Sequence, residues 1–445
     1  MNRRRFLEGC AGAAIGVALP AVTLPAVTLP GRILGANERI RLGFMGVGGR
    51  AGSLLHGFSS LAETDIAALA DVDSRRLPGA VRSVESLKSG KAPRVARDFR
   101  QIIDDRTIDA LVVGTPDHWH AIPTILACQA GKDVYVEKPC SHNIREGTLM
   151  VKAARQHDRV VQVGIQSRSS PHHRQAYEYV RSGKLGKVCL VKAWESTRQS
   201  NLGRPADQAS PPAGVDYDTW LGPAPERPFN PLRFHGNWRW FFDYGTGDLG
   251  NDGVHRLDYA LRGLNAARAA QGDGPVDFPR AVAASGGKYF FDDAQEWPDT
   301  MYVTYDYPGA TLVYELRVWT RYPIEGEHEG AAIYGENGYV VVGNGRWRAF
   351  DSQGKPTGDG GESINRTHHD PPHKRNFLEC IRSRKKPVCD IEIGHVTSTL
   401  CHTGNAAWRV GRKLAFDPRA QDFGRDEEAN RLVTRTYRKK WSLPG

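Results

Sequence analysis

The sequence has few cysteines for its length, and it lacks the basic runs that nucleic-acid-binding arms carry. Its 445 residues include seven cysteines, none of them in a C-x-x-C pair, which argues against structural zinc and dithiol redox motifs. Apart from the N-terminus and "RSRKK" (382–386), its 60 Lys and Arg are interleaved with 50 Asp and Glu. The net charge of +10 therefore indicates a generally basic surface and no nucleic-acid partner.

A run long enough to span a membrane is also missing. The apolar stretch Gly9–Val22 is too short for a bilayer and follows a basic start, which is the layout of an export signal. Residues 3–7 match the twin-arginine pattern R-R-x-F-L, although Glu8 replaces the usual Lys. We assign residues 1–36 to a twin-arginine signal and linker. We expect a periplasmic or otherwise exported protein with no membrane span once mature; an ordinary signal or a retained anchor is the alternative.

The length and the composition, 40% hydrophobic and 25% charged, predict two globular domains. Between residues 37 and 166, apolar strand patterns alternate with helical ones, which predicts an α/β domain with a doubly wound parallel sheet. Its ligand should lie at the carboxyl ends of the strands. Residues 167–445 contain strands of alternating polarity and hairpin turns at "PGA" and "GENG". They predict a second α/β domain with a broad antiparallel sheet, whose late helices pack back toward the first domain.

The first domain carries a dinucleotide-binding glycine turn. Gly46, Gly48 and Ala51 fit G-x-G-x-x-G/A between a strand and a helix; they permit a tight turn, close approach of a pyrophosphate and close helix packing. Asp71, about 20 residues later at the end of the next strand, can accept hydrogen bonds from the adenosine ribose, which favours NAD. Neighbouring arginines could instead hold a 2′-phosphate, so NADP stays an alternative: Arg50, Arg75 and Arg76.

Polar motifs follow the later strands of this domain. They are "TPDHWH" (115–120), "EKP" (137–139) and "GIQSR" (164–168), with "GVHRLD" (253–258) downstream. Together with the glycine turn, they resemble the Gfo/Idh/MocA family, the glucose–fructose oxidoreductase and inositol dehydrogenase group, over nearly everything after the signal. The resemblance implies a Rossmann domain followed by an α/β domain with a large, mostly antiparallel sheet. It also implies hydride transfer between a nicotinamide and a carbohydrate-like alcohol.

The resemblance implies a role for each motif. Lys138 would be the catalytic lysine, with a cis peptide before Pro139, and Glu137 would lie near the nicotinamide ribose. Three further residues would line the dinucleotide: Thr115, Pro116 and His120. The chemistry agrees, because oxidising a secondary alcohol needs a base for the hydroxyl proton, and a lysine beside a cationic ring in a dry cleft has a lowered pKa. Its ammonium can also stabilise a developing alkoxide.

The stretch "GTGDLGNDGVHRLDYALRGL" (245–264) crowds polar groups around His255. Family members commonly carry an aspartate four residues before this histidine, and here that position is Asn251. Asp252 reaches the same helix face. We predict that His255 is the acid/base group, since the pKa of histidine is naturally near neutrality, and that Asp252 or Asp258 orients it. We further predict that Asn251 binds a substrate hydroxyl and that Asp248 caps the helix. A single histidine does not favour a metal, and none is expected. A buried structural His255 is the alternative.

The segment 199–236 is long, rich in Pro and Gly, and without periodicity, which predicts a lid or binding loop. It leads into an aromatic cluster. Because sugar rings have apolar faces that stack on aromatic side chains, we expect Trp238 and Tyr244 to contact substrate together with Arg168. An aromatic core plug under the loop is the alternative.

Export constrains the cofactor, because no free nicotinamide pool replenishes it outside the cytoplasm. Retention for hours requires a dissociation constant of about 10⁻¹⁰ M. We therefore predict an NAD(P)-dependent oxidoreductase of a sugar or polyol with a tightly held cofactor, and a homo-oligomer formed through the C-terminal sheet. The nearest alternative is a redox-neutral NAD-dependent glycoside hydrolase that acts by oxidation, elimination, hydration and reduction. The other is a catalytically impaired sugar-binding protein, which Asn251 keeps open.

Overall fold

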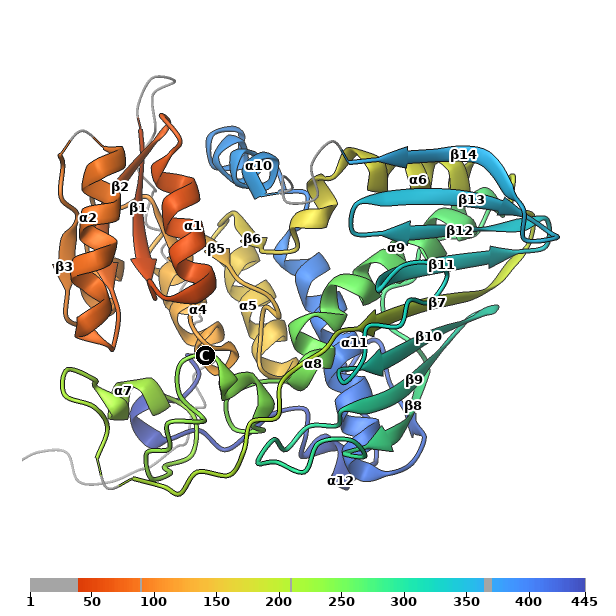
Figure 1. The fold of residues 1–445 in the computed structure, drawn as a ribbon. Helices are drawn as coiled ribbons and strands as arrows, with labels where there is room; N and C mark the ends of the chain where they lie inside the picture. The colour runs from red at the N-terminus through yellow and green to blue at the C-terminus, as the bar shows by residue number, and fades with distance from the viewer. Residues whose placement is uncertain (1–38, 89, 209, 364–369, 445) are drawn as a thin grey trace, which may run out of the picture.

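The structure is a computed structural model that describes residues 39–88, 90–208, 210–363 and 370–444. Two sheets organise the chain, with helices between them (Figure 1). The twin-arginine signal predicted at residues 1–36 lies outside the described residues. Within the described ranges, no helix combines the length and the apolar character needed to cross a bilayer.

The first sheet has six strands in the order β3-β2-β1-β4-β5-β6, and every neighbouring pair is parallel. The strands are β1 (Ile40–Met45), β2 (Thr64–Ala70), β3 (Arg94–Ala96), β4 (Ala110–Val113), β5 (Asp133–Val136) and β6 (Val161–Val163). Helices α1 (Gly49–Ser59), α2 (Leu77–Leu87), α3 (Arg100–Ile103), α4 (Ala121–Gln129) and α5 (Ile144–Gln156) connect them. The predicted doubly wound sheet is confirmed. Its order reverses between β1 and β4, where the carboxyl ends of the strands form a ligand crevice.

The second sheet has nine strands in the order β14-β13-β12-β11-β7-β10-β9-β8-β15. They are β7 (Val188–Ser196), β8 (Ala281–Gly287), β9 (Thr300–Tyr307), β10 (Ala310–Arg317), β11 (Glu329–Gly335), β12 (Gly338–Gly343), β13 (Arg346–Asp351), β14 (Pro356–Glu362) and β15 (Leu414–Ala415). β7 and β10 pair in parallel, and the other pairs given are antiparallel. The prediction of a large, mostly antiparallel sheet is confirmed.

Helices fill the space between the two sheets (Figure 1). α9 (Gly253–Ala270) packs on β7, β11 and α6 (Pro171–Arg181). The late helix α11 (Ile391–Val410) contacts both β8 and α5, and α10 (Asp370–Ser383) lies against α1. The late helices therefore contact the first domain. Shorter helices are α7 (Tyr217–Leu221), α8 (Gly247–Asn251) and α12 (Glu427–Asn430).

The C-terminal tail also returns to the first domain. The Trp441 ring lies edge-on to Trp119, with ring centroids 4.8 Å apart, and it also packs near Phe99. Both partners belong to the buried core of the parallel-sheet domain. The end of the chain thus helps to fix the turn that follows β4.

Candidate active site

A cleft of about 270 Å³ opens at the carboxyl ends of the parallel strands, where the segment after β7 crosses the crevice. Its lining comes from the glycine turn, from the ends of β2, β4 and β5, and from the segment that precedes α9. The sequence-predicted residues among the lining are Gly46, Gly48, Asp71, Thr115, Pro116, Glu137, Lys138, Trp238 and Asn251. The tertiary structure thus brings most of the predicted cofactor residues to one crevice.

The glycine turn has the shape that a dinucleotide requires. Gly46 has φ +88°, a conformation that a residue with a side chain adopts at a cost. A Cβ on Gly48 would lie 1.8 Å from Arg76 Nη1, so the Arg76 guanidinium occupies the space beside this glycine. Ala51 is buried and faces Gly114 across the helix–strand contact. The turn opens α1, whose first N–H groups suit a pyrophosphate.

Asp71 is anchored at the position expected for the adenosine ribose. One carboxylate oxygen accepts a hydrogen bond from the Val47 amide at 2.9 Å, and the other accepts from the Asp73 amide at 2.9 Å. The nearby Arg75 donates hydrogen bonds from Nε and Nη2 to the Asp73 carboxylate, each at 2.7 Å. Of the arginines considered for a 2′-phosphate, Arg75 is thus paired with Asp73 and does not line the cleft, whereas Arg76 lines it beside Gly48.

Arg50, in the glycine turn, is also engaged. Its Nε donates to Glu137 Oε1 at 2.8 Å, and its two terminal nitrogens donate to the Asp370 carboxylate at 2.6 and 2.9 Å. Glu137 is buried, and Gln166 donates to the same oxygen at 3.4 Å. Arg50 thus ties the glycine turn to the end of β5 and to α10. The sequence did not predict this clamp, because Asp370 lies 320 residues away.

The segment after β7 forms a lid, which we define as residues 197–208 and 210–246. It is fixed to the end of β2, since Val72 O accepts from the Asp216 amide at 2.8 Å and Gly214 O accepts from the Ser74 amide at 2.9 Å. His235 Nε2 lies 2.7 Å from Asp73 Oδ2. The lid lines the cleft with Thr219, Trp220, Gly236, Trp238 and Arg239, among others. It covers the cleft from the side opposite the glycine turn.

Lys138 and Asn251 face each other across the cleft. The Lys138–Pro139 peptide is cis. Lys138 Nζ donates to the backbone oxygen of Asn251 at 2.5 Å and lies 3.3 Å from its side-chain oxygen. Asp252 Oδ1 is 3.9 Å from the same nitrogen. The predicted catalytic lysine therefore lies against Asn251, the residue predicted to bind a substrate hydroxyl.

His255 lies one turn further along, on α9. Burial lowers the pKa of His255 well below its usual value, and the positive charges of Lys138 and Arg256 lower it further. The ring is therefore neutral at pH 7 and a weaker base than an ordinary histidine, so the near-neutral pKa expected from the sequence is wrong. Asp252, predicted to orient it, instead accepts a hydrogen bond from Asn251 Nδ2 at 3.0 Å.

Two family models match the chain. The NAD-binding Rossmann fold of the oxidoreductase family matches residues 40–165, and the C-terminal alpha/beta domain of that family matches residues 194–277 and 327–443. Both are Gfo/Idh/MocA models. The chain belongs to the Gfo/Idh/MocA oxidoreductase family. Residues 40–165 match the NAD-binding Rossmann fold of this oxidoreductase family.

Curated relatives and solved structures agree with this assignment. Inositol 2-dehydrogenase of Rubrobacter xylanophilus is 32% identical over 163 residues, 36% of this chain and 45% of that protein. A glycosyl hydrolase family 109 protein of Solibacter usitatus is 30% identical over 152 residues, 33% of this chain and 34% of that protein. The chain spans less than half the length of the curated relatives it matches.

Among solved structures, levoglucosan dehydrogenase in complex with NADH and levoglucosan has a TM-score of 0.62 at 17% identity, covering 85% of this chain and 99% of that one. The aldose-aldose oxidoreductase from Caulobacter crescentus, complexed with glycerol, has a TM-score of 0.61 at 21% identity, covering 85% of this chain and 100% of that one. At these identities the likeness establishes the fold.

Asp248 does not cap a helix in this Gfo/Idh/MocA chain, so that prediction is wrong. The N-cap of α8 is Thr246, and Asp248 lies inside the first turn, buried. Its Oδ1 accepts from Asn251 Nδ2 at 3.4 Å, and its Oδ2 has no hydrogen-bond partner among the described residues. Burial, reinforced by the negative charge of Asp252, raises the pKa of Asp248 to about 7. A titratable carboxyl therefore contacts Asn251 from the preceding turn, where sequence spacing suggested only a cap.

Ala51, Asp252 and His255, described above, are not among the lining residues of the cleft. Three other predicted residues are likewise absent from that lining. Tyr244 is fully buried against the Trp220 and His118 rings, with centroids 4.8 and 5.4 Å away. His120 is buried with its ring nitrogens 2.6 Å from Pro139 O and 2.9 Å from Thr115 O, so it braces the two loops that line the cleft. Tyr244 and His120 therefore support the walls of the cleft from behind.

Arg168 is the third of these residues. Its Nε and Nη2 donate to Asp258 Oδ1 at 2.8 and 2.6 Å, and it lines a different cavity. Asp258, predicted as an orienting group for His255, is thus paired with Arg168. Within the described residues, no group of three His, Cys, Asp or Glu is arranged to hold a metal, and the six described cysteines are free.

Proposed function

We propose that this protein is an exported NAD-dependent oxidoreductase that acts on a sugar or polyol and keeps its cofactor bound through turnover. The observation that carries the proposal is the position of Lys138 Nζ, 2.5 Å from Asn251 O in the dinucleotide cleft, with His255 on the following helix. Bound NAD⁺ supplies the hydride acceptor. Sugar and polyol substrates are named in the relatives and neighbours, inositol and levoglucosan among them.

The chain's own residues supply positioning and proton transfer. Lys138 Nζ is placed to exchange a proton with the reacting hydroxyl, and the two oxygens of Asn251 hold this nitrogen in position. His255, on the helix that follows Asn251, is the second group proposed for proton transfer, and its lowered pKa keeps it neutral before the reaction. Trp238 offers an aromatic face in the cleft, with the Arg239 guanidinium 5.5 Å from its ring centroid. An arrangement of one lysine, one histidine and one aromatic wall suits an alcohol on an uncharged ring.

Retention of the cofactor is supported by the lid. It is joined to the ribose end of the cleft by His235 and by the two backbone hydrogen bonds at Val72 and Ser74. Dissociation of the dinucleotide would require those contacts to open. Export is supported by the twin-arginine pattern of residues 3–7, because that route carries folded proteins with their cofactors.

The experiment is to purify the protein, denature it and identify the released dinucleotide and its redox state after incubation with a panel of sugars and polyols. We expect one NAD(H) per chain, reduced by at least one compound in the panel. Release of no dinucleotide would refute the trapped-cofactor proposal, and a bound NAD⁺ that no compound reduces would refute the oxidoreductase activity.

A redox-neutral glycoside hydrolase is the second candidate. It is favoured by the similarity to glycosyl hydrolase family 109 proteins and by a titratable Asp248 beside Asn251, which could move the proton that elimination requires. Release of the aglycone from chromogenic glycosides without net change in the reduced nicotinamide band would select it. Sugar binding without either reaction would select the third candidate, an impaired binding protein.

We also propose that copies of the chain associate through the face of the nine-stranded sheet that points away from α9. Leu190 and Tyr302 are 40% and 43% exposed on strands of this sheet. A small apolar cluster around Trp194 is packed there with Tyr334, Tyr339 and Phe350. Light scattering on the wild type and on Tyr302→Lys tests this; a wild type that is monomeric at micromolar concentration would contradict it.

A further inference from the structure

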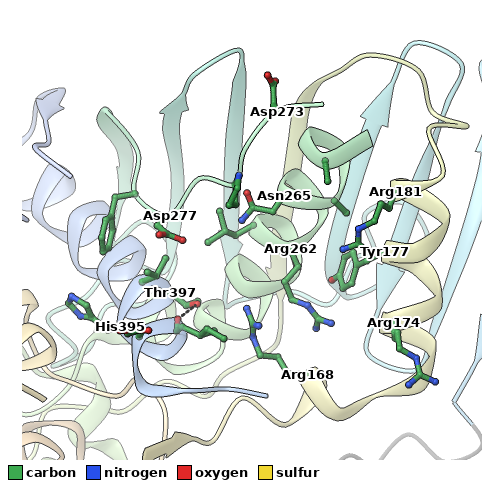
Figure 2. Close-up of a pocket in the computed structure, with 18 of the residues that line it drawn as sticks. Arg168, Arg174, Tyr177, Arg181, Arg262, Asn265, Asp273, Asp277, His395 and Thr397 are labelled. Carbon is green, nitrogen blue, oxygen red and sulfur yellow. Dashed lines mark hydrogen bonds between the residues drawn. The ribbon is translucent and has the colours of Figure 1, made fainter. Parts of the chain in front are cut away.

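A second cavity, of about 880 Å³, lies on the helical side of the second domain between α6, α9 and α11 (Figure 2). The loop that follows α9 closes one side of it, with Asp273 and Asp277 in the lining. None of its lining residues lines the dinucleotide cleft. It is therefore a separate site, on the same helix that carries His255.

Two arginines of this cavity share one carboxylate. Arg168 donates twice to Asp258 Oδ1, at 2.8 and 2.6 Å. Arg262, one turn further along α9, has its Nη1 3.9 Å from Asp258 Oδ2. The side chain of Asp258 is fully buried, and those of Arg168 and Arg262 are 15% and 18% exposed. Two guanidinium charges thus face a single negative charge away from bulk water.

Arg262 is the unsatisfied member of this group. Its Nη1 is buried and has no hydrogen-bond partner among the described residues, and Asp258 Oδ2 likewise has none. The contact between them is therefore only an electrostatic one. The guanidinium lies over the Tyr177 ring, 4.4 Å from the centroid. Because a buried cation without a full partner costs free energy, an anion at Arg262 would stabilise the site.

The other acidic residues of the lining do not supply that anion. Most have cationic partners of their own: Glu178 with Arg174 at 3.8 Å, Asp273 with Arg268 at 3.7 Å, and Glu392 with Arg155 at 3.0 Å. Asp277 is drawn on the opposite side of the cavity from Arg168 and Arg262 (Figure 2). Burial and the negative charge of Glu392 raise the pKa of Asp277. The arginine end of the cavity therefore keeps an excess of positive charge.

We propose that this cavity binds a small molecule through an oxyanion group, carboxylate or phosphate, which accepts hydrogen bonds from Arg262 while Arg168 contributes its charge. The planar guanidinium matches both groups. The volume leaves room for the rest of a metabolite-sized molecule between α6 and α11. Since Arg262 follows His255 by two turns of α9, the site is built on the catalytic helix, outside the reacting centre.

The test is calorimetric titration of the wild-type holoprotein with sodium citrate and with sodium phosphate, at an ionic strength fixed with NaCl. We expect saturable binding of at least one of them, and Arg262→Gln should weaken it about 10-fold or more. The matched control is Arg409→Gln, which removes a guanidinium lying 4.5 Å from the Phe242 ring centroid, outside this cavity, and should bind as the wild type does. Binding of citrate alone or phosphate alone supports the proposal and identifies the group.

The proposal is overturned if the wild type binds neither anion, or if Arg262→Gln binds both with unchanged affinity. A second measurement does not depend on the variant's folding. Wild-type crystals soaked in sodium selenate should show an anomalous difference peak beside Arg262. Ordered selenate found only elsewhere on the protein would refute the site.

Discussion

Lys138 Nζ lies 2.5 Å from the backbone oxygen of Asn251 and 3.3 Å from its side-chain oxygen. The lysine that follows β5 is thus held by the residue at the end of α8. An amide can hold an ammonium but cannot take its proton. The titratable groups nearest this pair are Asp252, 3.9 Å from Nζ, and Asp248, which contacts the Asn251 amide.

Replacing Lys138 with Met should lower kcat by about 10²- to 10⁴-fold, the range for loss of a positioned proton acceptor. The apolar side chain fills similar space, so NAD content should not change. Single-turnover reduction of the bound cofactor by an active sugar measures the effect. A rate within twofold of wild type would remove Lys138 from the mechanism.

His255→Gln should also lower kcat, by about 10²-fold or more. Because burial and the charge of Lys138 lower the pKa of His255, the wild-type enzyme should keep this group neutral down to acid pH, below the usual titration range of histidine. The kcat–pH profile checks both points. An acid limb that persists unchanged in His255→Gln would assign that limb to another residue.

Asp248→Asn should alter the pH dependence of stability. Burial raises the folded-state pKa of Asp248 to about 7, above the ordinary value of about 3.9 in an unfolded chain. The folded state therefore binds this proton more tightly, and the stability it contributes is lost as pH rises from about 4 through 7. The amide variant should lose that dependence and become more stable than the wild type at pH 8. Denaturant midpoints at pH 5 and pH 8 measure this, and equal shifts at both would contradict it.

Asp258→Asn should destabilise the fold by about 3–5 kcal/mol, because it leaves Arg168 and Arg262 buried without their shared carboxylate. Equilibrium unfolding in urea measures the loss. Glu178→Gln is the matched control, since it removes an exposed ion pair with Arg174 and should cost no more than about 1 kcal/mol. Similar losses for the two variants would show that Asp258 is not needed to neutralise the arginines.

His235→Ala should speed release of the cofactor by about 10- to 100-fold, the loss expected for one hydrogen bond to a charged group. It removes the contact between the lid and Asp73 Oδ2 at 2.7 Å. NAD remaining after timed gel filtration measures the rate. The control is Arg204→Ala, also in the lid, which breaks only an exposed ion pair with Asp292 outside the lid and should leave retention unchanged. Equal retention in His235→Ala would place the control of release elsewhere.

Much of the cofactor side could be predicted because its signals are local. The turn at Gly46 and Gly48 requires glycine for backbone reasons, and Asp71 and Lys138 follow apolar strands whose carboxyl ends meet at one edge. In a parallel sheet the carboxyl ends of all strands lie along the same edge. The predicted strands therefore brought these residues together without any knowledge of long-range contacts.

The substrate side depended on contacts between distant segments. Tyr244 carries the same aromatic signal as Trp238, yet it packs into the core beside Trp220 while Trp238 lines the cleft. Asp248 has the sequence position of a helix cap, but the helix begins two residues earlier than that role needs, with Thr246 as its N-cap, and the carboxyl is buried. Helix boundaries and burial depend on packing, which spacing alone does not specify.

By itself, the sequence determined the fold class, the dinucleotide turn, the lysine at the strand end and the histidine helix, because backbone propensity and hydrophobic periodicity act over short stretches. Only the tertiary structure decided that Arg168 pairs with Asp258 instead of lining the cleft, that His235 joins the lid to Asp73, and that Asn251 holds Lys138. Those contacts join residues that lie 90, 162 and 113 positions apart in the sequence. The packing of helices and sheets determines which residues become partners. Local sequence patterns do not predict this choice.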